Sequence, residues 1–172
     1  MGIEEILGDY QGFLDDALGS LTFKGFEIDR EFKELDHLCF KTASQKEYDR
    51  TVTMLENYGE TISENIISGR PIAVIKLDEP INYKGFQIPA VEVPAPKPEG
   101  DDGRSGLEHL EFVTVKSLPE FRKDHADLDF DDKNMNREIN PVLILRFADF
   151  NVKFHNRPLL EVAQIQKETG KI

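Results

Sequence analysis

Two histidines occupy the same place in two similar segments of this 172-residue chain. His37 lies in "ELDHLCFKT", residues 34–42, and His109 lies in "GLEHLEFVT", residues 106–114. Both segments have the alternating apolar pattern of a β-strand, and each has an acidic residue directly before the histidine. Burial of an unpaired imidazole or carboxylate is costly, so such groups usually form a hydrogen-bond network or bind a metal ion.

Alternation along a strand assigns these side chains to two faces. The apolar positions expected to face a following helix are Leu38, Phe40, Leu110 and Phe112. His37, His109 and Glu111 then lie on the opposite, concave face, whereas alternation places Glu108 away from it. Three interpretations of the histidine pair are open: metal ligands, a hydrogen-bonded pocket pair without metal, or ordinary partly buried histidines.

The similarity of the two segments extends into a repeated strand–helix unit. The identical pairs are Leu35/Leu107, His37/His109, Leu38/Leu110, Phe40/Phe112 and Thr42/Thr114. Each segment is followed by a capping box, Ser44 to Glu47 and Ser117 to Glu120, which predicts the start of a helix. In the first box Glu47 is expected to reach back to the Ser44 amide, and Gly59 is expected to end the helix in a left-handed conformation.

The remaining elements follow from periodicity and turn residues. The expected elements are an amphipathic helix from Ile3 to Leu21, a helix over 45–58, strands over 60–68, 70–78, 85–93, 141–149 and 150–156, and a closing helix or turn over 157–168. A Pro-, Gly- and Asp-rich stretch, 94–106, is expected to be a linker or exposed loop. The N-terminal helix either packs over the rest of the fold or binds a partner.

The last strand of each half adds polar groups to the concave face. In the first half alternation places Glu92 there, and in the second half it places Lys153 and His155 there. Three of the four histidines therefore share one face. The fourth, His125, is expected at the surface, and Cys39 is expected to be a buried small residue rather than a nucleophile.

The arrangement resembles the vicinal oxygen chelate superfamily of glyoxalase I, extradiol dioxygenases and bleomycin-resistance proteins. The chain resembles the YecM family within that superfamily more closely still. It rests on "DHLCFKT", "SENIISGRPIAVIKLDEP", "VEVPAPKP", "LEHLEFV" and "VKFHNRPLLEV", which span roughly residues 36–161. The resemblance implies an α+β fold of two tandem βαβββ modules that form a curved mixed sheet around a cavity, with the amphipathic helix at the N-terminus.

The resemblance also implies a divalent metal ion, Zn, Ni, Mn or Fe. Superfamily ligands come from the first and last strand of each module, which maps onto His37, Glu92 and His109. In the second half the chain offers His155 or Lys153 where the enzymes of the superfamily usually supply glutamate. Glu111, on the same face as His109, either substitutes for that glutamate or serves as the general base.

The resemblance implies a metal-dependent isomerase, lyase or oxygenase acting on a small oxygen-bearing substrate. Basic residues on or beside core strands either bind an anionic substrate or pair with Glu92 and Glu111: Arg70, Lys76, Arg146 and Lys153. Two competing classes are a non-catalytic small-molecule binding protein with the same cavity and a scaffold that acts through its N-terminal helix.

Composition narrows the class of protein. Thirty-three acidic against 21 basic residues give a net charge of -12, which disfavours nucleic acid as a partner. The single cysteine, the lack of a signal-peptide pattern and the lack of a long apolar run predict a cytoplasmic protein without membrane association. We expect one domain, monomeric or homodimeric, divided into 1–33, the N-terminal helix and connection, and two modules, 34–98 and 99–172.

Overall fold

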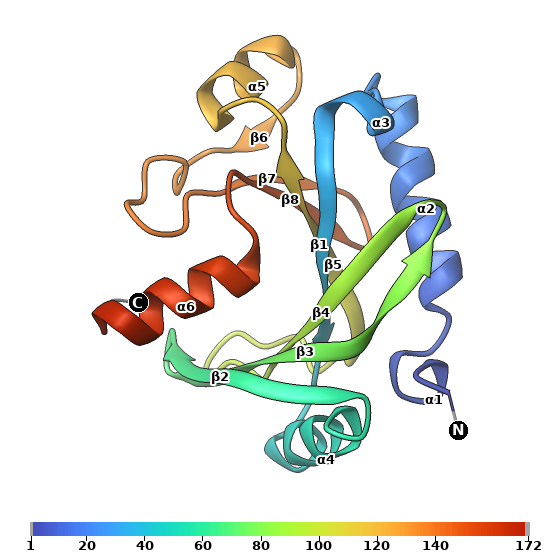
Figure 1. Cartoon of the computed structure of the whole chain (residues 1–172), viewed down its shortest axis with the longest axis vertical. Coiled ribbons are helices and arrows are strands. Elements are labelled where there is room, and N and C mark those ends of the chain that lie inside the picture. The colour runs from blue at the N-terminus through green and yellow to red at the C-terminus, as the bar shows by residue number, and fades with distance from the viewer. Residues whose placement is uncertain (1, 171–172) are drawn as a thin grey trace.

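The computed structural model describes residues 2–170, in which eight strands form one curved, mixed sheet (Figure 1). The strands are β1 (Phe32–Lys41), β2 (Gly59–Ile67), β3 (Arg70–Tyr83), β4 (Phe86–Pro94), β5 (Gly106–Thr114), β6 (Phe130–Asp131), β7 (Leu143–Arg146) and β8 (Asn151–His155). The helices are α1 (Glu4–Leu7), α2 (Tyr10–Phe23), α3 (Ile28–Glu31), α4 (Gln45–Leu55), α5 (Leu118–Asp124) and α6 (Leu159–Thr169). Residues 1, 171 and 172 lie outside the described residues. The division expected from the sequence places them in the segments 1–33 and 99–172.

The sheet is built from two copies of the same unit. Its strand order is β2-β3-β4-β1-β5-β8-β7-β6, so each half places its last strand beside its first. That pair is parallel in both halves, β1 with β4 and β5 with β8, while the other pairs are antiparallel. The predicted α+β fold of two tandem βαβββ modules is confirmed.

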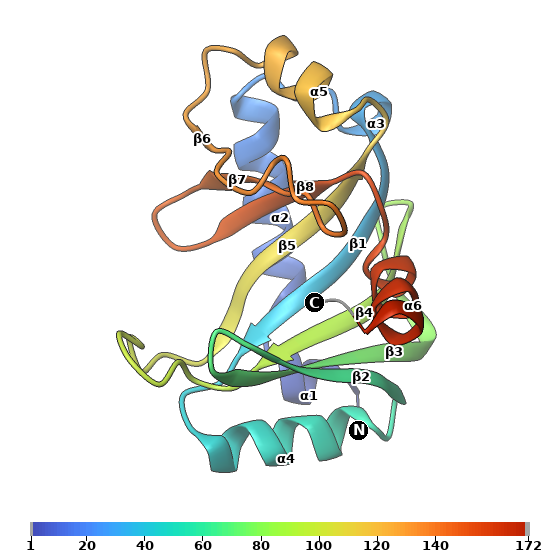
Figure 2. The same ribbon diagram turned by 90° about the vertical axis from the view of Figure 1, so that its left-hand side faces the viewer.

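The two modules join through the antiparallel pair β1 and β5, which cross the centre of the molecule (Figure 2). Leu38 lies opposite Leu110, His37 lies opposite Glu111, and Cys39 lies opposite His109. In the sequence repeat Leu38 corresponds to Leu110, so an approximate two-fold axis passes between these two leucines. The axis relates the pair His37 and Glu111 to the pair His109 and Cys39.

The core lies between the outer face of the sheet and the helices α2, α4 and α5. Leu38, Leu110 and Phe112 are fully buried there, as alternation predicted. The ring of Phe112 stacks on Phe32 with 4.3 Å between centroids, within a cluster of aromatic side chains. Truncation of such a side chain to alanine costs about 3 to 5 kcal/mol, so this packing holds the strands that carry the histidines.

Two details of the α4 region differ from expectation. The Glu47 amide donates to Ser44 Oγ at 3.1 Å as predicted, but the Glu47 carboxylate accepts from the Ala43 amide at 2.8 Å rather than from Ser44. The helix ends at Leu55, and Gly59 is the first residue of β2 rather than a left-handed stop. A Cβ on Gly59 would lie 2.1 Å from the carbonyl oxygen of Lys76, so close strand pairing explains this glycine.

The N-terminal segment forms two helices instead of one. Gly8 has a φ of +70°, which breaks the predicted helix, and the Asp9 side chain caps α2 by accepting from the Gly12 amide at 2.9 Å. The apolar face of α2 is buried in the core through Leu14, Ala17 and Leu21, which supports the packing role. In the described part of the chain, no helix is long and apolar enough to cross a membrane.

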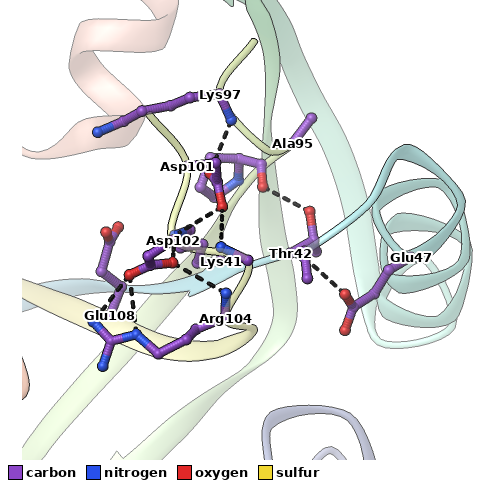
Figure 3. A network of polar contacts seen from close by, with 12 residues as sticks. Lys41, Thr42, Glu47, Ala95, Lys97, Asp101, Asp102, Arg104 and Glu108 are labelled. Carbon is purple, nitrogen blue, oxygen red and sulfur yellow. Dashed lines mark hydrogen bonds and ion pairs between the residues drawn. The ribbon is translucent and has the colours of Figure 1, made fainter. Parts of the chain in front are cut away.

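The loop between the modules is held by ion pairs at the end of β1 (Figure 3). The ammonium of Lys41, a buried residue, lies 3.2 Å from Asp101 and also contacts Asp102. Asp101 in turn accepts from the backbone amides of Lys97 and Gly103 at 2.9 and 2.8 Å. The predicted exposed loop therefore has a fixed path along the edge of the concave face.

Candidate metal centre and cavity

Three histidines from three strands converge on one buried carboxylate. His37 Nε2 on β1 lies 3.4 Å and His109 Nε2 on β5 lies 3.1 Å from the same oxygen, Oε1, of Glu111. His155 Nε2 on β8 contacts the other oxygen of Glu111. All four side chains are buried, so the concave face carries an enclosed imidazole–carboxylate cluster.

The other ring nitrogen of each of these histidines faces an oxygen. His37 Nδ1 lies 2.9 Å from Asp36, His109 Nδ1 lies 3.4 Å from Glu108, and His155 Nδ1 lies 2.9 Å from the carbonyl oxygen of Pro141. A carbonyl oxygen only accepts, so His155 donates from Nδ1. Such contacts hold the ring and direct Nε2 toward the cluster, as they do for histidines that bind metals.

Two β-bulges place the acidic partners. The β1–β5 register skips Asp36 on β1 and Glu108 on β5, because each is an extra residue between two paired positions. Consecutive residues then lie on the same side, and Glu108 lines the same cavity as His109. The prediction that alternation sends Glu108 away is therefore wrong. In the sequence, the two bulges are marked only by the acidic residue that precedes each histidine.

Asp36 also connects the cluster to α6. Its Oδ2 accepts from the amide of Leu159, the first residue of α6, at 2.9 Å, in addition to its bond with His37. A carboxylate at a helix N-terminus is stabilised by the free amides and the helix dipole. Helix α6 lies on the concave side of the sheet, opposite α2 (Figure 1).

Lys153 and Glu92 complete the polar floor of the cavity. Lys153 Nζ lies 2.9 Å from Glu111 Oε1 and 2.9 Å from His109 Nε2. Glu92 Oε1 lies 3.7 Å from His109 Nε2. Burial opposes the charge of Lys153, but Glu111 and Glu92 outweigh it and raise the pKa of Lys153 above its usual value.

The buried charges also shift the pKa of His37 and Glu111. Burial disfavours the charged form of His37, but the carboxylates of Glu111 and Asp36 outweigh it and raise the pKa of His37 to about 10. Burial favours neutral Glu111, but the surrounding cationic groups, Lys153 first, hold the pKa of Glu111 well below its usual range. The carboxylate is therefore ionised, and a metal ion that binds here must displace the proton of His37.

The cluster fits a divalent ion by its donor set. His37, His109 and Glu111 each offer one ligand atom, and these atoms lie within 4.8 Å of one another. The Nε2 atoms of His37 and His155 are buried, and each lies against an oxygen of Glu111. A second group, Cys39, Glu92 and His109, also brings its ligand atoms within 4.8 Å, although burial raises the pKa of the Cys39 thiol.

His109, Glu111 and His155 line the floor of a cavity of about 330 Å³, and His37 is fully buried beside Glu111 without lining it. The rim of the cavity carries Arg70 and Lys97 from the first module and Arg137 from the loop before β7. Arg146 lines it too, but its guanidinium binds Asp131 at 2.7 Å. Of the predicted cationic residues only Lys76 lies elsewhere, in a separate groove beside α6.

His125 is not the surface residue expected from the sequence. Its side chain is 12% exposed and its ring lies 4.2 Å from that of Phe26. His125 Nε2 lies 2.5 Å from Glu31, so this histidine joins the N-terminal segment to α5. It lies outside the cavity and takes no part in the cluster.

The family model "YecM protein" matches residues 2–156. The chain belongs to the YecM family. It is 37% identical over 78 residues to Protein YecM of Escherichia coli (strain K12), covering 45% of this chain and 41% of that protein. An uncharacterized protein of Haemophilus influenzae is 31% identical over 90 residues, covering 52% and 47%. The chain thus aligns with less than half the length of these relatives.

Solved structures show the same fold. A structural-genomics protein named EC4020 has a TM-score of 0.76 at 24% identity, covering 94% of this chain and 92% of that one. Methylmalonyl-CoA epimerase from Mycobacterium tuberculosis has a TM-score of 0.56 at 12% identity, covering 81% and 98%. The epimerase is a vicinal oxygen chelate protein, so this YecM chain has the fold of that superfamily.

Proposed function

We propose that this YecM protein is a divalent-metal-dependent enzyme of the glyoxalase type that acts on a small oxygen-bearing molecule. The observation that carries the proposal is the convergence of three imidazole Nε2 atoms on the buried Glu111 carboxylate. His37, His109 and Glu111 would hold the ion, and His155 is the additional ligand candidate at the far oxygen of Glu111. Two imidazoles and one carboxylate form a donor set that suits Zn and non-haem Fe.

The ion, when bound, supplies Lewis-acid polarisation of a substrate carbonyl, enolate or catecholate oxygen. Glu92 is then the general base. It lines the cavity, its side chain is 17% exposed, and its nearer oxygen is 3.7 Å from His109 Nε2, outside hydrogen-bond distance. The sequence interpretation gave Glu92 to the metal and Glu111 to proton transfer, with the opposite role also open for each of them. The observed distances favour the exchange of these two roles, because Glu111 lies between the histidines.

Lys153 is expected to affect both metal binding and catalysis. Its ammonium shares Glu111 Oε1 with the two histidines, so it competes with an ion for that oxygen. In the loaded site the same ammonium stabilises negative charge on a substrate oxygen. Removal of Lys153 is therefore expected to strengthen metal binding and to weaken catalysis.

A metal titration tests the proposal. We expect the wild type to bind one equivalent of Zn, Ni, Mn or Fe and to gain thermal stability, and the variant His37→Ala/His109→Ala to lose at least a hundredfold in affinity. His125→Gln is the matched control, because His125 lies outside the cavity. A wild type that neither binds a stoichiometric ion nor gains stability with any of the four metals would refute the metalloenzyme.

One observation favours a second candidate, a small-molecule binding protein without metal. Lys153 gives Glu111 a cationic partner from the chain itself, so the buried charges are paired without an ion. This candidate predicts ligand binding that does not change with chelator. The metal titration separates the two candidates.

A further inference from the structure

We propose that the cavity binds a small organic acid, with a carboxylate of the ligand held at a cationic rim formed by Arg70, Lys97 and Arg137. The rim assignment rests on the cavity itself. The orientation of the ligand, with its reacting oxygen toward His37, His109 and Glu111, and the effect of a bound ion on its affinity rest on the proposed function.

The rim cations differ from the other cations of the cavity in having free donors. Arg70 donates from one Nη atom to the carbonyl oxygen of Ala95 at 2.9 Å, and its Nε is buried without a partner among the described residues. The side chains of Lys97 and Arg137 are exposed, and within residues 2–170 they have no ion-pair partner. Arg146 and Lys153, by contrast, are already paired with Asp131 and Glu111.

This arrangement is unexpected in a chain with a net charge of -12. Acidic residues are abundant, and an unpaired cation on such a surface would ordinarily have an acidic neighbour. Three cations from two modules instead line one cavity, and none of the three has an ion-pair partner within residues 2–170. A positive rim within an acidic surface attracts an anion locally and selects against neutral molecules.

The charges on the floor support the same ligand. Glu92, Glu108 and Glu111 are matched by Lys153 and a divalent ion, so the loaded floor is neutral. The positive charge of the rim is then not offset by the floor and can attract an anionic ligand. Without the ion the floor is negative, so a loaded site is expected to bind the anion more tightly than an ion-free site.

A carboxylate fits this rim better than a phosphate does. Phosphate sites commonly use free amides at a helix N-terminus, but the first amide of α6, Leu159, is already bonded to Asp36. Guanidinium groups bind carboxylates and phosphates alike through paired N–H donors, so the occupied helix amide is the observation that favours the carboxylate. Apolar side chains between rim and floor provide contact for a short hydrocarbon segment: Ile72, Val142, Ile144 and Leu159.

The size of the cavity limits the ligand. At about 330 Å³ it lies near the lower end of the range for small-molecule sites, about 300 to 1,000 Å³. The position of Lys97 is fixed by the Lys41 and Asp101 contacts of the loop, and its side chain points away from that network (Figure 3). The rim is therefore built for a compact acid.

Succinate is the probe, with succinamide as its neutral counterpart and inorganic phosphate as the competing anion. Binding is measured by calorimetry at low ionic strength, with and without Zn. We expect succinate to bind at least tenfold more tightly than succinamide, and Arg70→Gln and Arg137→Gln each to weaken succinate binding by roughly tenfold. Arg50→Gln, on the exposed face of α4, is the matched control.

The outcomes separate this inference from the proposed function. Equal binding of succinate and succinamide, or succinate binding unaffected by both rim substitutions, would overturn the inference even if a metal binds. Tighter binding of phosphate than of succinate would overturn the carboxylate assignment. Rim-dependent succinate binding in a protein that takes up no metal would support the inference while the metalloenzyme fails.

Discussion

The two modules share one backbone plan but differ in charge at related positions. The approximate two-fold axis relates Glu111 to Cys39, and the matching positions of β4 and β8 carry Glu92 and Lys153. Across the β1–β5 pair, His109 therefore lies opposite the thiol of Cys39, and His37 lies opposite the carboxylate of Glu111. Two modules with one backbone plan therefore carry a carboxylate and a thiol at one pair of related positions, and an ammonium and a carboxylate at the other.

The largest expected effect is the difference in stability and metal affinity between a substitution of Glu111 and one of its counterpart, Cys39. Glu111→Gln leaves His37, His155 and Lys153 without their common carboxylate, so we expect a loss of about 3 to 5 kcal/mol in the free energy of unfolding. Metal binding should fall at least a thousandfold. Cys39→Ala should cost about 1 to 2 kcal/mol and leave metal affinity unchanged. Urea unfolding and metal titration measure both, and equal effects of the two substitutions would contradict the asymmetry.

Replacing the positive charge of Lys153 by a negative one tests whether the difference between the modules at this position affects metal affinity. Lys153→Glu makes the second module match the first, and it replaces a competitor of the ion by a ligand. We expect metal affinity to rise at least tenfold. Lys153→Met is the matched control, because it removes the ammonium without adding a carboxylate, and its gain should be smaller. A fall in affinity for Lys153→Glu would show that Lys153 supports the ion.

The two acidic partners of the histidines should contribute unequally. Asp36 is buried and bonds His37 Nδ1 at 2.9 Å, whereas Glu108 is partly exposed and lies 3.4 Å from His109 Nδ1. Asp36→Asn should weaken metal binding roughly 10- to 100-fold, and Glu108→Gln should weaken it less. Nitrogen-15 spectra of the imidazoles check the mechanism, since Asp36→Asn should alter the His37 resonances specifically.

The smallest expected effect is the acid dependence of Glu108. Its bond to His109, the largest cause, lowers the pKa of Glu108 to about 2. A lowered pKa in the folded state contributes stability above the unfolded value, near 4.5, and this stability is lost as the pH falls through about 2. Wild type and Glu108→Gln should therefore differ in unfolding free energy at pH 5 and converge near pH 2. A constant difference across that range would argue against the ion pair.

Sequence periodicity predicted the faces of β1 and β5 correctly where the register is regular. Leu38 and Leu110 are buried on the helix side, and His37 and His109 lie on the cavity side. Alternation has no means of marking an inserted residue, so the bulges and the position of Glu108 were missed. The packing of His125 depends on Phe26 and Glu31, which are remote in sequence, and no local pattern predicts it.

The site residues show the same limit. His37 and His109 could be recognised from the sequence because they occupy the same position in two similar segments. The roles of Glu92 and Glu111 depend on distances of a few ångströms across neighbouring strands, which spacing along the chain does not determine. Arg137 lies in a loop without periodicity and reaches the cavity only through the fold.

X-ray absorption on the Zn-loaded protein tests the central claim most directly. A metal held by His37, His109 and Glu111 predicts nitrogen and oxygen neighbours at about 2.0 to 2.2 Å, with scattering from at least two imidazoles and no sulfur. A sulfur neighbour at about 2.3 Å would place the ion at Cys39, Glu92 and His109 instead and would contradict the account.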